Sequence, residues 1–160
     1  MEDILYNIYC DMDGVLVDFE KGIVNKMNEE LSSDNPKLPK LANKVVEELG
    51  RNYVTADDIA KYSSGKSKAS IKYMYALVHD DEEFWATLPW INGGKQLWAR
   101  IRNLNPMILT SPMDKKGKNE SMLGKSRWVE RNLGLPPERI IFAHSKWDYP
   151  LDESGQPNIL

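Results

Sequence analysis

The chain has 160 residues, of which 41% are hydrophobic and 28% are charged, and its formal net charge is −3. This length can close one core with a small appended unit but is too short for two large domains. The negative charge argues against a protein that binds a nucleic-acid polymer through its phosphate backbone, because such binding normally requires a basic protein surface.

The first informative segment is an apolar run that ends in two acidic residues. Residues 4–10 are rich in β-branched and aromatic side chains and predict a buried strand, which places Asp11 at its carboxyl end. Asp13 and Gly14 follow, and Gly14 allows the backbone to turn over the site. Two carboxylates this close repel unless a cation or a shared proton intervenes, and a divalent metal is the simplest remedy. The plainer alternative is an ordinary turn, where Asp often precedes Gly.

Residues 19–83 indicate helices and contain no convincing strand. A four-residue spacing of Phe19, Ile23, Met27 and Leu31 predicts the first helix. Further helices are expected from residue 42 to Gly50, from Thr55 to Tyr62, and over Ile71 to Val78. Residues 35–39 and 63–67 are the breaks between them.

Aromatic residues follow where the helical segment ends. Phe84, Trp85 and Trp90 offer flat apolar faces on which a nucleoside base could stack, although packing at a hinge explains such residues equally well. A helix carrying Leu97, Trp98 and Ile101 is then predicted after the Gly93-Gly94 pair.

A second apolar strand, residues 107–110, ends in Thr110 and Ser111, followed by Pro112. Hydroxyl and backbone N–H groups at a strand end can hold a phosphoryl oxygen. Residues 124–134 then predict a helix with Lys125 at its start and Gly134 as its cap. A lysine there can offset the charge of a phosphate, although a single lysine is more often solvated. Residues 140–143 predict a third strand.

In their order and in their sequence motifs, these segments resemble the haloacid dehalogenase (HAD) superfamily of phosphohydrolases. The closest resemblance is to the 5′(3′)-deoxyribonucleotidases and their phage and bacterial relatives, and it covers most of the chain. It rests on residues 11–19, 84–90 and 109–112, and on Lys125 followed by Trp128-Val129. The resemblance implies an α/β fold: a Rossmann-like HAD core with a parallel sheet, formed by residues 1–18 and 84–160. Residues 19–83 would form a small helical cap inserted after the first strand.

The resemblance also implies a magnesium-dependent hydrolysis of (deoxy)nucleoside monophosphates in two steps. Asp11 would attack the phosphorus to give an aspartyl phosphate, and Asp13 would act as the general acid and base. Mg²⁺ would be held at Asp11 and Asp13, through the carboxylate of the first and the carbonyl of the second. Thr110, Ser111 and Lys125 would bind the phosphoryl oxygens.

Substrate contacts beyond the phosphate are implied as well. In the resembling nucleotidases, aromatic residues at the cap and hinge form the base pocket, which points to Phe84 and Trp85 in this chain. His144 and Lys146, after the third strand, would add a positive edge near the substrate, although a solvated loop explains them too. The expected partner is a small nucleotide and not a nucleic-acid polymer.

One departure concerns the end of the chain. The superfamily has a fourth motif, a strand ending in one or two Asp residues that complete the metal site, and this sequence reaches only Pro157 to Leu160. We expect a truncated form of that strand. Its loss would weaken metal binding and activity, and would leave the Asp11 strand with an open edge that a second copy of the chain could cover, giving a homo-oligomer.

Other readings remain open. The chain could hydrolyse another small phosphate ester, or bind a nucleotide or phosphate without catalysis. The single cysteine, Cys10, excludes an internal disulfide and is expected to be a small buried core residue. No apolar stretch approaches the roughly 20 residues of a membrane span, and the first residues lack the basic start of a signal peptide. We therefore expect a cytoplasmic protein that does not bind membranes.

Overall fold

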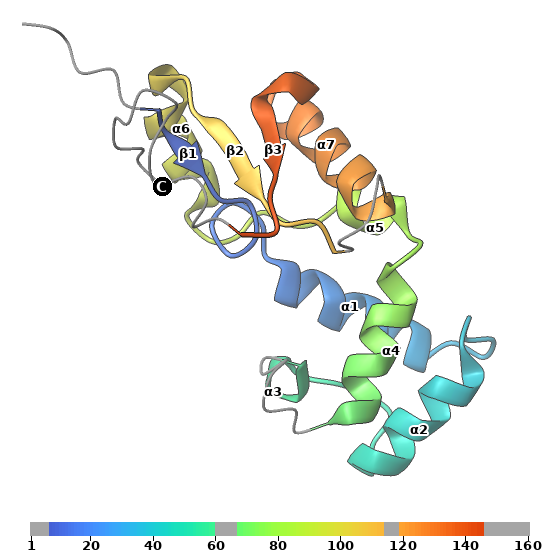
Figure 1. The fold of residues 1–160 in the computed structure, drawn as a ribbon. Coiled ribbons are helices and arrows are strands. Elements are labelled where there is room, and N and C mark those ends of the chain that lie inside the picture. Colours follow the sequence, from blue (N-terminus) through green and yellow to red (C-terminus); the bar gives the residue numbers. More distant parts are fainter. Residues whose placement is uncertain (1–6, 60–66, 114–118, 146–160) are drawn as a thin grey trace, which may run out of the picture.

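The computed structural model describes residues 7–59, 67–113 and 119–145. Within these ranges the chain forms an α/β structure with a three-stranded parallel sheet in the order β1-β2-β3 (Figure 1). The strands are β1 (Tyr9–Cys10), β2 (Met107–Thr110) and β3 (Ile140–Phe142). The expected α/β class with a parallel sheet is confirmed, whereas the HAD core stays a prediction.

The register of the sheet brings the three strand ends together. Cys10 pairs with Ile108 across β1 and β2, and Ile108 and Thr110 pair with Ile140 and Phe142 across β2 and β3. Because all three strands run the same way, the residues that follow each strand lie along one edge of the sheet. No described strand pairs with the other edge of β1, and association of that edge with a second copy stays a prediction.

A tight turn follows β1 and redirects the chain. The carbonyl oxygen of Met12 accepts hydrogen bonds from the N–H groups of Leu16 and Val17 at 2.9 and 3.0 Å. Gly14 has a φ of 75°, a left-handed conformation that a side chain would strain. The turn therefore depends on this glycine, and it holds Asp11 and Asp13 on either side of Met12.

Helices occupy the segment for which the sequence predicted them. They are α1 (Phe19–Leu31), α2 (Pro39–Leu49), α3 (Ala56–Ile59) and α4 (Lys68–Val78). Ile23 and Met27 of α1 are fully buried, which confirms the four-residue spacing. In Figure 1 these helices lie together on the side of the molecule towards which the strands point. The boundaries of a separate cap at residues 19–83 remain a prediction.

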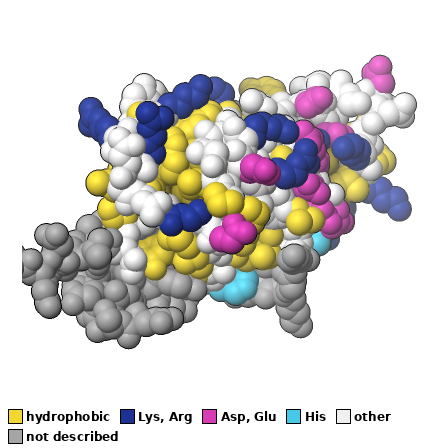
Figure 2. All heavy atoms as spheres, turned by 90° about the horizontal axis from the view of Figure 1, so that it is seen from above, with side chains coloured by type: hydrophobic (Ala, Val, Ile, Leu, Met, Phe, Trp, Pro, Cys, Tyr) yellow, Lys and Arg dark blue, Asp and Glu magenta, His cyan; other side chains and the backbone are white. Residues whose placement is uncertain are grey.

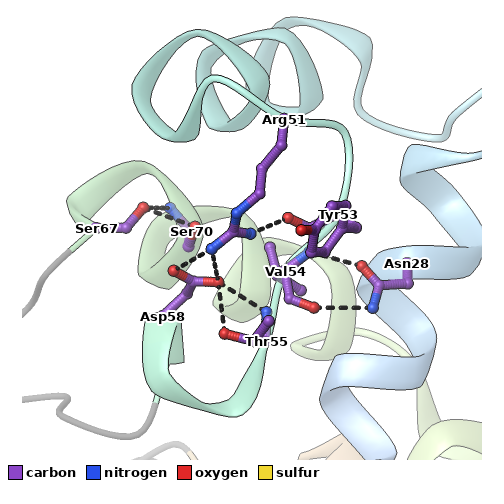
Figure 3. Close-up of polar contacts among 8 residues, drawn as sticks. All are labelled: Asn28, Arg51, Tyr53, Val54, Thr55, Asp58, Ser67 and Ser70. Atoms are coloured by element: carbon purple, nitrogen blue, oxygen red, sulfur yellow. Dashed lines mark hydrogen bonds and ion pairs between the residues drawn. The ribbon is translucent and has the colours of Figure 1, made fainter.

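A polar network joins the loop between α2 and α3 to the neighbouring helices (Figure 3). The guanidinium of Arg51 donates to both carboxylate oxygens of Asp58, at 2.9 and 2.7 Å. The amide of Asn28 on α1 makes two hydrogen bonds with the backbone of Val54, at 2.9 and 2.7 Å. Asp58 also accepts hydrogen bonds from the N–H and the hydroxyl of Thr55, the residue before α3, at 2.7 and 3.0 Å.

The remaining helices belong to the part of the chain that contains β2 and β3. They are α5 (Glu82–Ala86), α6 (Gly94–Ile101) and α7 (Glu120–Leu133), together with the short 3-10 turns η1 (Arg102–Leu104) and η2 (Pro137–Arg139). The start predicted for α7 was wrong by four residues, because Asn119 caps the helix by accepting from the N–H of Met122 at 3.1 Å. Lys125 is therefore in the second turn of α7.

The core joins the sheet to both groups of helices. Buried side chains run from Ile108 and Leu109 of the sheet through Trp128 and Val129 of α7. The indole N–H of Trp128 donates to the carbonyl of Leu88 at 2.8 Å, so this large side chain is buried with its polar atom paired. None of the helices in the described ranges has both the length and the apolar character needed to cross a bilayer.

Candidate active site

Five of the predicted site residues lie at the carboxyl ends of β1 and β2. Asp11 and Asp13 follow β1, Thr110 is the last residue of β2, and Ser111 is the next one. Lys125 reaches the same place from α7. The sequence predicted this group from three separate segments, and the structure brings Asp13, Thr110, Ser111 and Lys125 into direct contact.

The ammonium group of Lys125 is the centre of the cluster. Its Nζ lies 2.6 Å from Oδ2 of Asp13, 2.7 Å from the carbonyl oxygen of Ser111 and 3.3 Å from the hydroxyl of Thr110. Lys125 is only 1% exposed, and a lysine is almost never buried unless its charge is paired. A solvated surface lysine is thereby ruled out.

The two aspartates differ in their contacts. One carboxylate oxygen of Asp13 binds Lys125, whereas the other, Oδ1, is buried without a hydrogen-bond partner among the described residues. Oδ1 of Asp11 accepts from the N–H of Met12 at 2.7 Å, which fixes the orientation of this carboxylate. A buried carboxylate oxygen without a donor is an energetic cost that a bound cation or a proton would remove.

These oxygen atoms suit a hard divalent cation. The described residues contain no group of three or more acidic, histidine or cysteine side chains able to surround a metal. Mg²⁺ does not require such a group, because it keeps several waters and is commonly bound through one or two carboxylates and a substrate phosphate. The donor set of Asp11 and Asp13 fits that mode of binding.

Two aromatic side chains, Trp85 and Phe19, form an aromatic wall beside Lys125. Nζ of Lys125 lies 5.1 Å from the ring centre of Trp85, within the range of a cation–π contact. The ring of Phe19 stacks on Trp85 at 5.4 Å with an angle of 14° between the planes. The indole N–H of Trp85 donates to the carbonyl of Val78 at 2.9 Å, so the side chain is held from α4.

Phe84 and Trp85, the two residues predicted to bind the base, are placed differently. Both are buried, at 8% and 3% exposure, and their rings meet edge to face at 5.2 Å. Phe84 lines a cavity of about 540 Å³ with residues of α1 and of the segment that follows α5, and neither Asp11 nor Lys125 lines it. Of the two aromatic residues, only Trp85 has a contact with the lysine at the strand ends.

The second pair of predicted substrate contacts is described only in part. The N–H of Ala143 donates to the carbonyl of Thr110 at 2.9 Å, which extends the pairing of β2 and β3 to the residue before His144. His144 therefore follows the third strand at the same edge of the sheet, and it is exposed. Lys146 lies outside the described residues, as does the predicted fourth-motif segment at 157–160.

The sequence did not predict the contacts that two residues near the site make. Phe19 was predicted to lie on the apolar face of a helix, and its stacking on Trp85 was not predicted. Ser121 is 1% exposed, and its hydroxyl accepts from the N–H of Met113 at 2.9 Å, which ties the loop after β2 to α7. Asn119 is a typical residue for the start of a helix, and this signal could have placed Ser121 in the first turn of α7.

Cys10 next to Asp11 is the small buried residue that the sequence predicted. It is 6% exposed, and burial, assisted by the negative charge of Asp11, raises the pKa of its thiol to about 11. A thiol with such a pKa is neutral and a poor nucleophile at ordinary pH. Cys10 is thus a packing residue of β1.

Comparisons with known proteins do not identify the chain. No family model matches it, and no curated protein does. The case for a function therefore rests on the residues and on the geometry of the cluster around Lys125.

Proposed function

We propose that this chain is a phosphoric monoester hydrolase that converts (deoxy)nucleoside monophosphates to nucleoside and phosphate. The observation that carries the proposal is the buried Lys125, which is held by Asp13, Thr110 and Ser111 at the ends of two parallel strands. Burying the charge of Lys125 costs free energy of desolvation, and an ion pair with Asp13 does not reliably recover that cost. A role in binding a ligand would explain why the charge is buried here. The HAD-like core, the cap of residues 19–83 and a cytoplasmic location belong to this proposal.

The phosphoryl group would be bound by the cluster around the lysine. A phosphate that enters beside Lys125 would compete with Asp13 for the ammonium hydrogens. The hydroxyl groups of Thr110 and Ser111 would donate to its remaining oxygens. Positioning and charge stabilisation of this kind supply most of the catalysis in phosphoryl transfer.

The chemistry itself would be divided between the two aspartates. A carboxylate oxygen of Asp11 would form a bond to phosphorus while the bond to the sugar oxygen breaks, giving an aspartyl phosphate and the nucleoside. Asp13 would deliver a proton to the departing sugar oxygen, then take a proton from the water that cleaves the aspartyl phosphate. Asp13 is well placed for both steps because its Oδ1 has no partner among the described residues.

Mg²⁺ would be held by the carboxylate of Asp11 and the carbonyl oxygen of Asp13. When bound, it would supply positive charge that lowers the repulsion between the carboxylates and the phosphate. Among the described residues, Asp11 and Asp13 would supply the protein ligands.

A nucleoside leaving group is supported by the aromatic wall beside the site. Trp85 borders Lys125 and is stacked on Phe19, so aromatic rings lie next to the proposed phosphate site, although Trp85 itself is only 3% exposed. Phe84 would contribute from behind Trp85. His144 and Lys146 would add positive charge on the side of β3.

The test is phosphate release from a panel of deoxy- and ribonucleoside monophosphates, with and without Mg²⁺. The panel should include non-nucleotide phosphate esters. The matched variants are Asp13→Asn and the exposed Asp34→Asn, which removes an acidic side chain away from the site. We expect metal-dependent release that Asp13→Asn abolishes and Asp34→Asn preserves.

The other outcomes separate the alternatives. Release from simple esters but not from nucleotides would replace the nucleotide with another phosphate ester. Nucleotide binding that survives Asp13→Asn, with no release by the unaltered chain, would indicate a binding protein and contradict the hydrolase proposal.

A further inference from the structure

A second hollow lies between α6 and α7, away from the candidate active site. Its volume is about 350 Å³. The residues that line it and matter here are Trp90, Lys95, Trp98, Arg102, Arg131 and Asn132. Neither aspartate of the candidate active site, nor Lys125, belongs to its lining.

The charges around this hollow are all of one sign. Lys95, Arg102 and Arg131 are exposed, and no carboxylate lines the hollow beside them. No ion pair joins any of the three to an acidic side chain in the described ranges. Arg102 and Arg131 each lie near a helix C-terminus, where the helix dipole favours a positive charge. The dipole does not explain why both arginines and a lysine border the same hollow.

This concentration of positive charge contrasts with the net charge of −3 of the whole chain. Figure 2 views the molecule from above and shows Lys and Arg side chains among hydrophobic ones on the left of the view, whereas on the right Lys and Arg are interspersed with Asp and Glu. A local field of this kind attracts anions even to an acidic protein.

The hollow also has flat, fixed walls. The indole N–H of Trp90 donates to the side-chain oxygen of Asn132 at 3.2 Å, and the amide of Asn132 donates to the carbonyl of Trp128 at 2.9 Å. Trp90 further packs against Trp128 at 4.9 Å, and Trp98 is 8% exposed. Nζ of Lys95 lies 5.8 Å from the ring centre of Trp90. The aromatic lining is thus held in place before any ligand arrives.

We propose that this hollow is a second binding site, which takes a nucleoside phosphate without hydrolysing it. The guanidinium groups of Arg102 and Arg131 can each bind phosphate oxygens in a forked geometry, and Lys95 adds a third positive charge. The indole walls suit the flat, apolar base. A volume of about 350 Å³ is near the lower end of small-molecule pockets, which fits one nucleotide better than a polymer.

The test is calorimetric titration of the full chain with inorganic phosphate, a nucleoside monophosphate and a nucleoside triphosphate. The test variant is the double substitution Arg102→Ala/Arg131→Ala, and the matched control is Arg100→Ala, an exposed arginine of α6 that does not line the hollow. All titrations are repeated in a Lys125→Met background, which removes the lysine of the candidate active site. Binding to the hollow then remains measurable whether or not the chain is a hydrolase.

We expect a nucleotide to bind in the Lys125→Met background, and to bind at least about tenfold more weakly after the double substitution, because two charge-assisted contacts are lost. Arg100→Ala should leave the affinity unchanged. Equal affinity with and without the double substitution would overturn the proposal. So would an equal loss in Arg100→Ala, which indicates diffuse charge, or inorganic phosphate binding as tightly as the nucleotides, which leaves the indole walls without a role.

Discussion

Lys125 is the residue on which the candidate site depends most. Three oxygen atoms hold its ammonium group within 3.3 Å, and the ring of Trp85 covers it. A positive charge fixed where water is largely excluded acts on a bound phosphate with little screening, so it is worth more than the same charge in solvent.

Replacing Lys125 by Met keeps most of the side-chain volume and removes the charge. We expect kcat/KM for phosphate release to fall about 10²- to 10³-fold, the usual effect of losing one preorganised electrostatic contact. The measurement is initial-rate kinetics, with urea unfolding to confirm that the variant is folded. Lys44→Met, at an exposed position of α2, serves as the control. Unchanged kinetics in a folded Lys125→Met protein would remove the lysine from the proposed mechanism.

Cys10 gives a prediction that is independent of catalysis. Burial, with a smaller effect of Asp11, raises the pKa of its thiol to about 11, so the reactive thiolate is nearly absent at pH 8. Iodoacetamide should therefore alkylate the native protein far more slowly than the urea-unfolded protein, by at least about tenfold. Similar rates in both states, followed by mass spectrometry, would contradict the buried position.

At the scale of residues, the sequence predicted the polar groups better than their surroundings. Asp11 and Asp13 were expected at a strand end, and the resemblance to a known superfamily singled them out together with Lys125. The stacking of Phe19 on Trp85 was not predicted, because a ring contact between α1 and α5 depends on how two helices cross. Periodicity shows which face is apolar but not which neighbour it meets.

At the scale of helices, α5 and α7 approach each other closely at Gly124. A Cβ atom at this position would overlap the carbonyl oxygen of Glu82 and the Cβ of Trp85. Both atoms belong to the main body of α5 and cannot rotate away. The glycine therefore sets the distance at which Trp85 can lie beside Lys125.

Gly124→Ala should destabilise the protein although alanine favours helices. The gain in helix propensity is about 1 kcal/mol, whereas overpacking against backbone costs about 1–3 kcal/mol, so we expect a net loss of up to about 2 kcal/mol. Urea unfolding measures it, and Glu130→Ala on the exposed side of α7 is the control. A variant as stable as the control would show that α5 does not pack here.

The Arg51–Asp58 pair makes the stability of the α2–α3 connection depend on pH. Partial burial alone would raise the pKa of Asp58, but hydrogen bonds from Arg51 and Thr55 outweigh it and lower the pKa below its usual value. The folded state is therefore favoured above the pKa of the unfolded chain, about 4, and this advantage is lost as the pH falls through the lower folded value.

Asp58→Asn should lower the free energy of unfolding at pH 7 by about 1–2 kcal/mol. The difference from the unaltered protein should shrink as the pH falls below about 4, because both proteins then lack the charge. Urea unfolding over a pH series measures this. Asp57→Asn, the exposed neighbour on α3, should show no such pH dependence, and a matching dependence in Asp57→Asn would contradict the assignment to the Arg51–Asp58 pair.

Most helices and strands were predicted from the sequence, and the errors have physical causes. Residues 107–110 formed the predicted strand, since a short apolar run after a turn leaves few alternatives. The start of α7 was missed because the helix begins with Glu120 and Ser121, and Leu123 is 42% exposed, so its first turn does not continue the buried apolar face.

At the scale of the whole molecule, parallel strands bring distant segments to one edge. Asp13 and Lys125 are separated by 112 positions in the chain and meet at 2.6 Å. That the residues after β1 and β2 share an edge follows from parallel strands joined by helices. The place of Lys125 beside them was expected from the resemblance, since Lys125 lies on α7 and not at a strand end. The sequence could not predict the hollow between α6 and α7, since its lining comes from helix surfaces whose relative position no local pattern determines.

The most direct test of the account is to look for the phosphoryl group on Asp11. A single turnover with a nucleoside monophosphate and Mg²⁺ is quenched in acid, and the protein is analysed by peptide mass spectrometry. We predict a phosphorylated Asp11 in the unaltered chain, with neither phosphorylation nor phosphate release in Asp11→Ala. Phosphate release by Asp11→Ala at the rate of the unaltered chain would contradict the proposed mechanism.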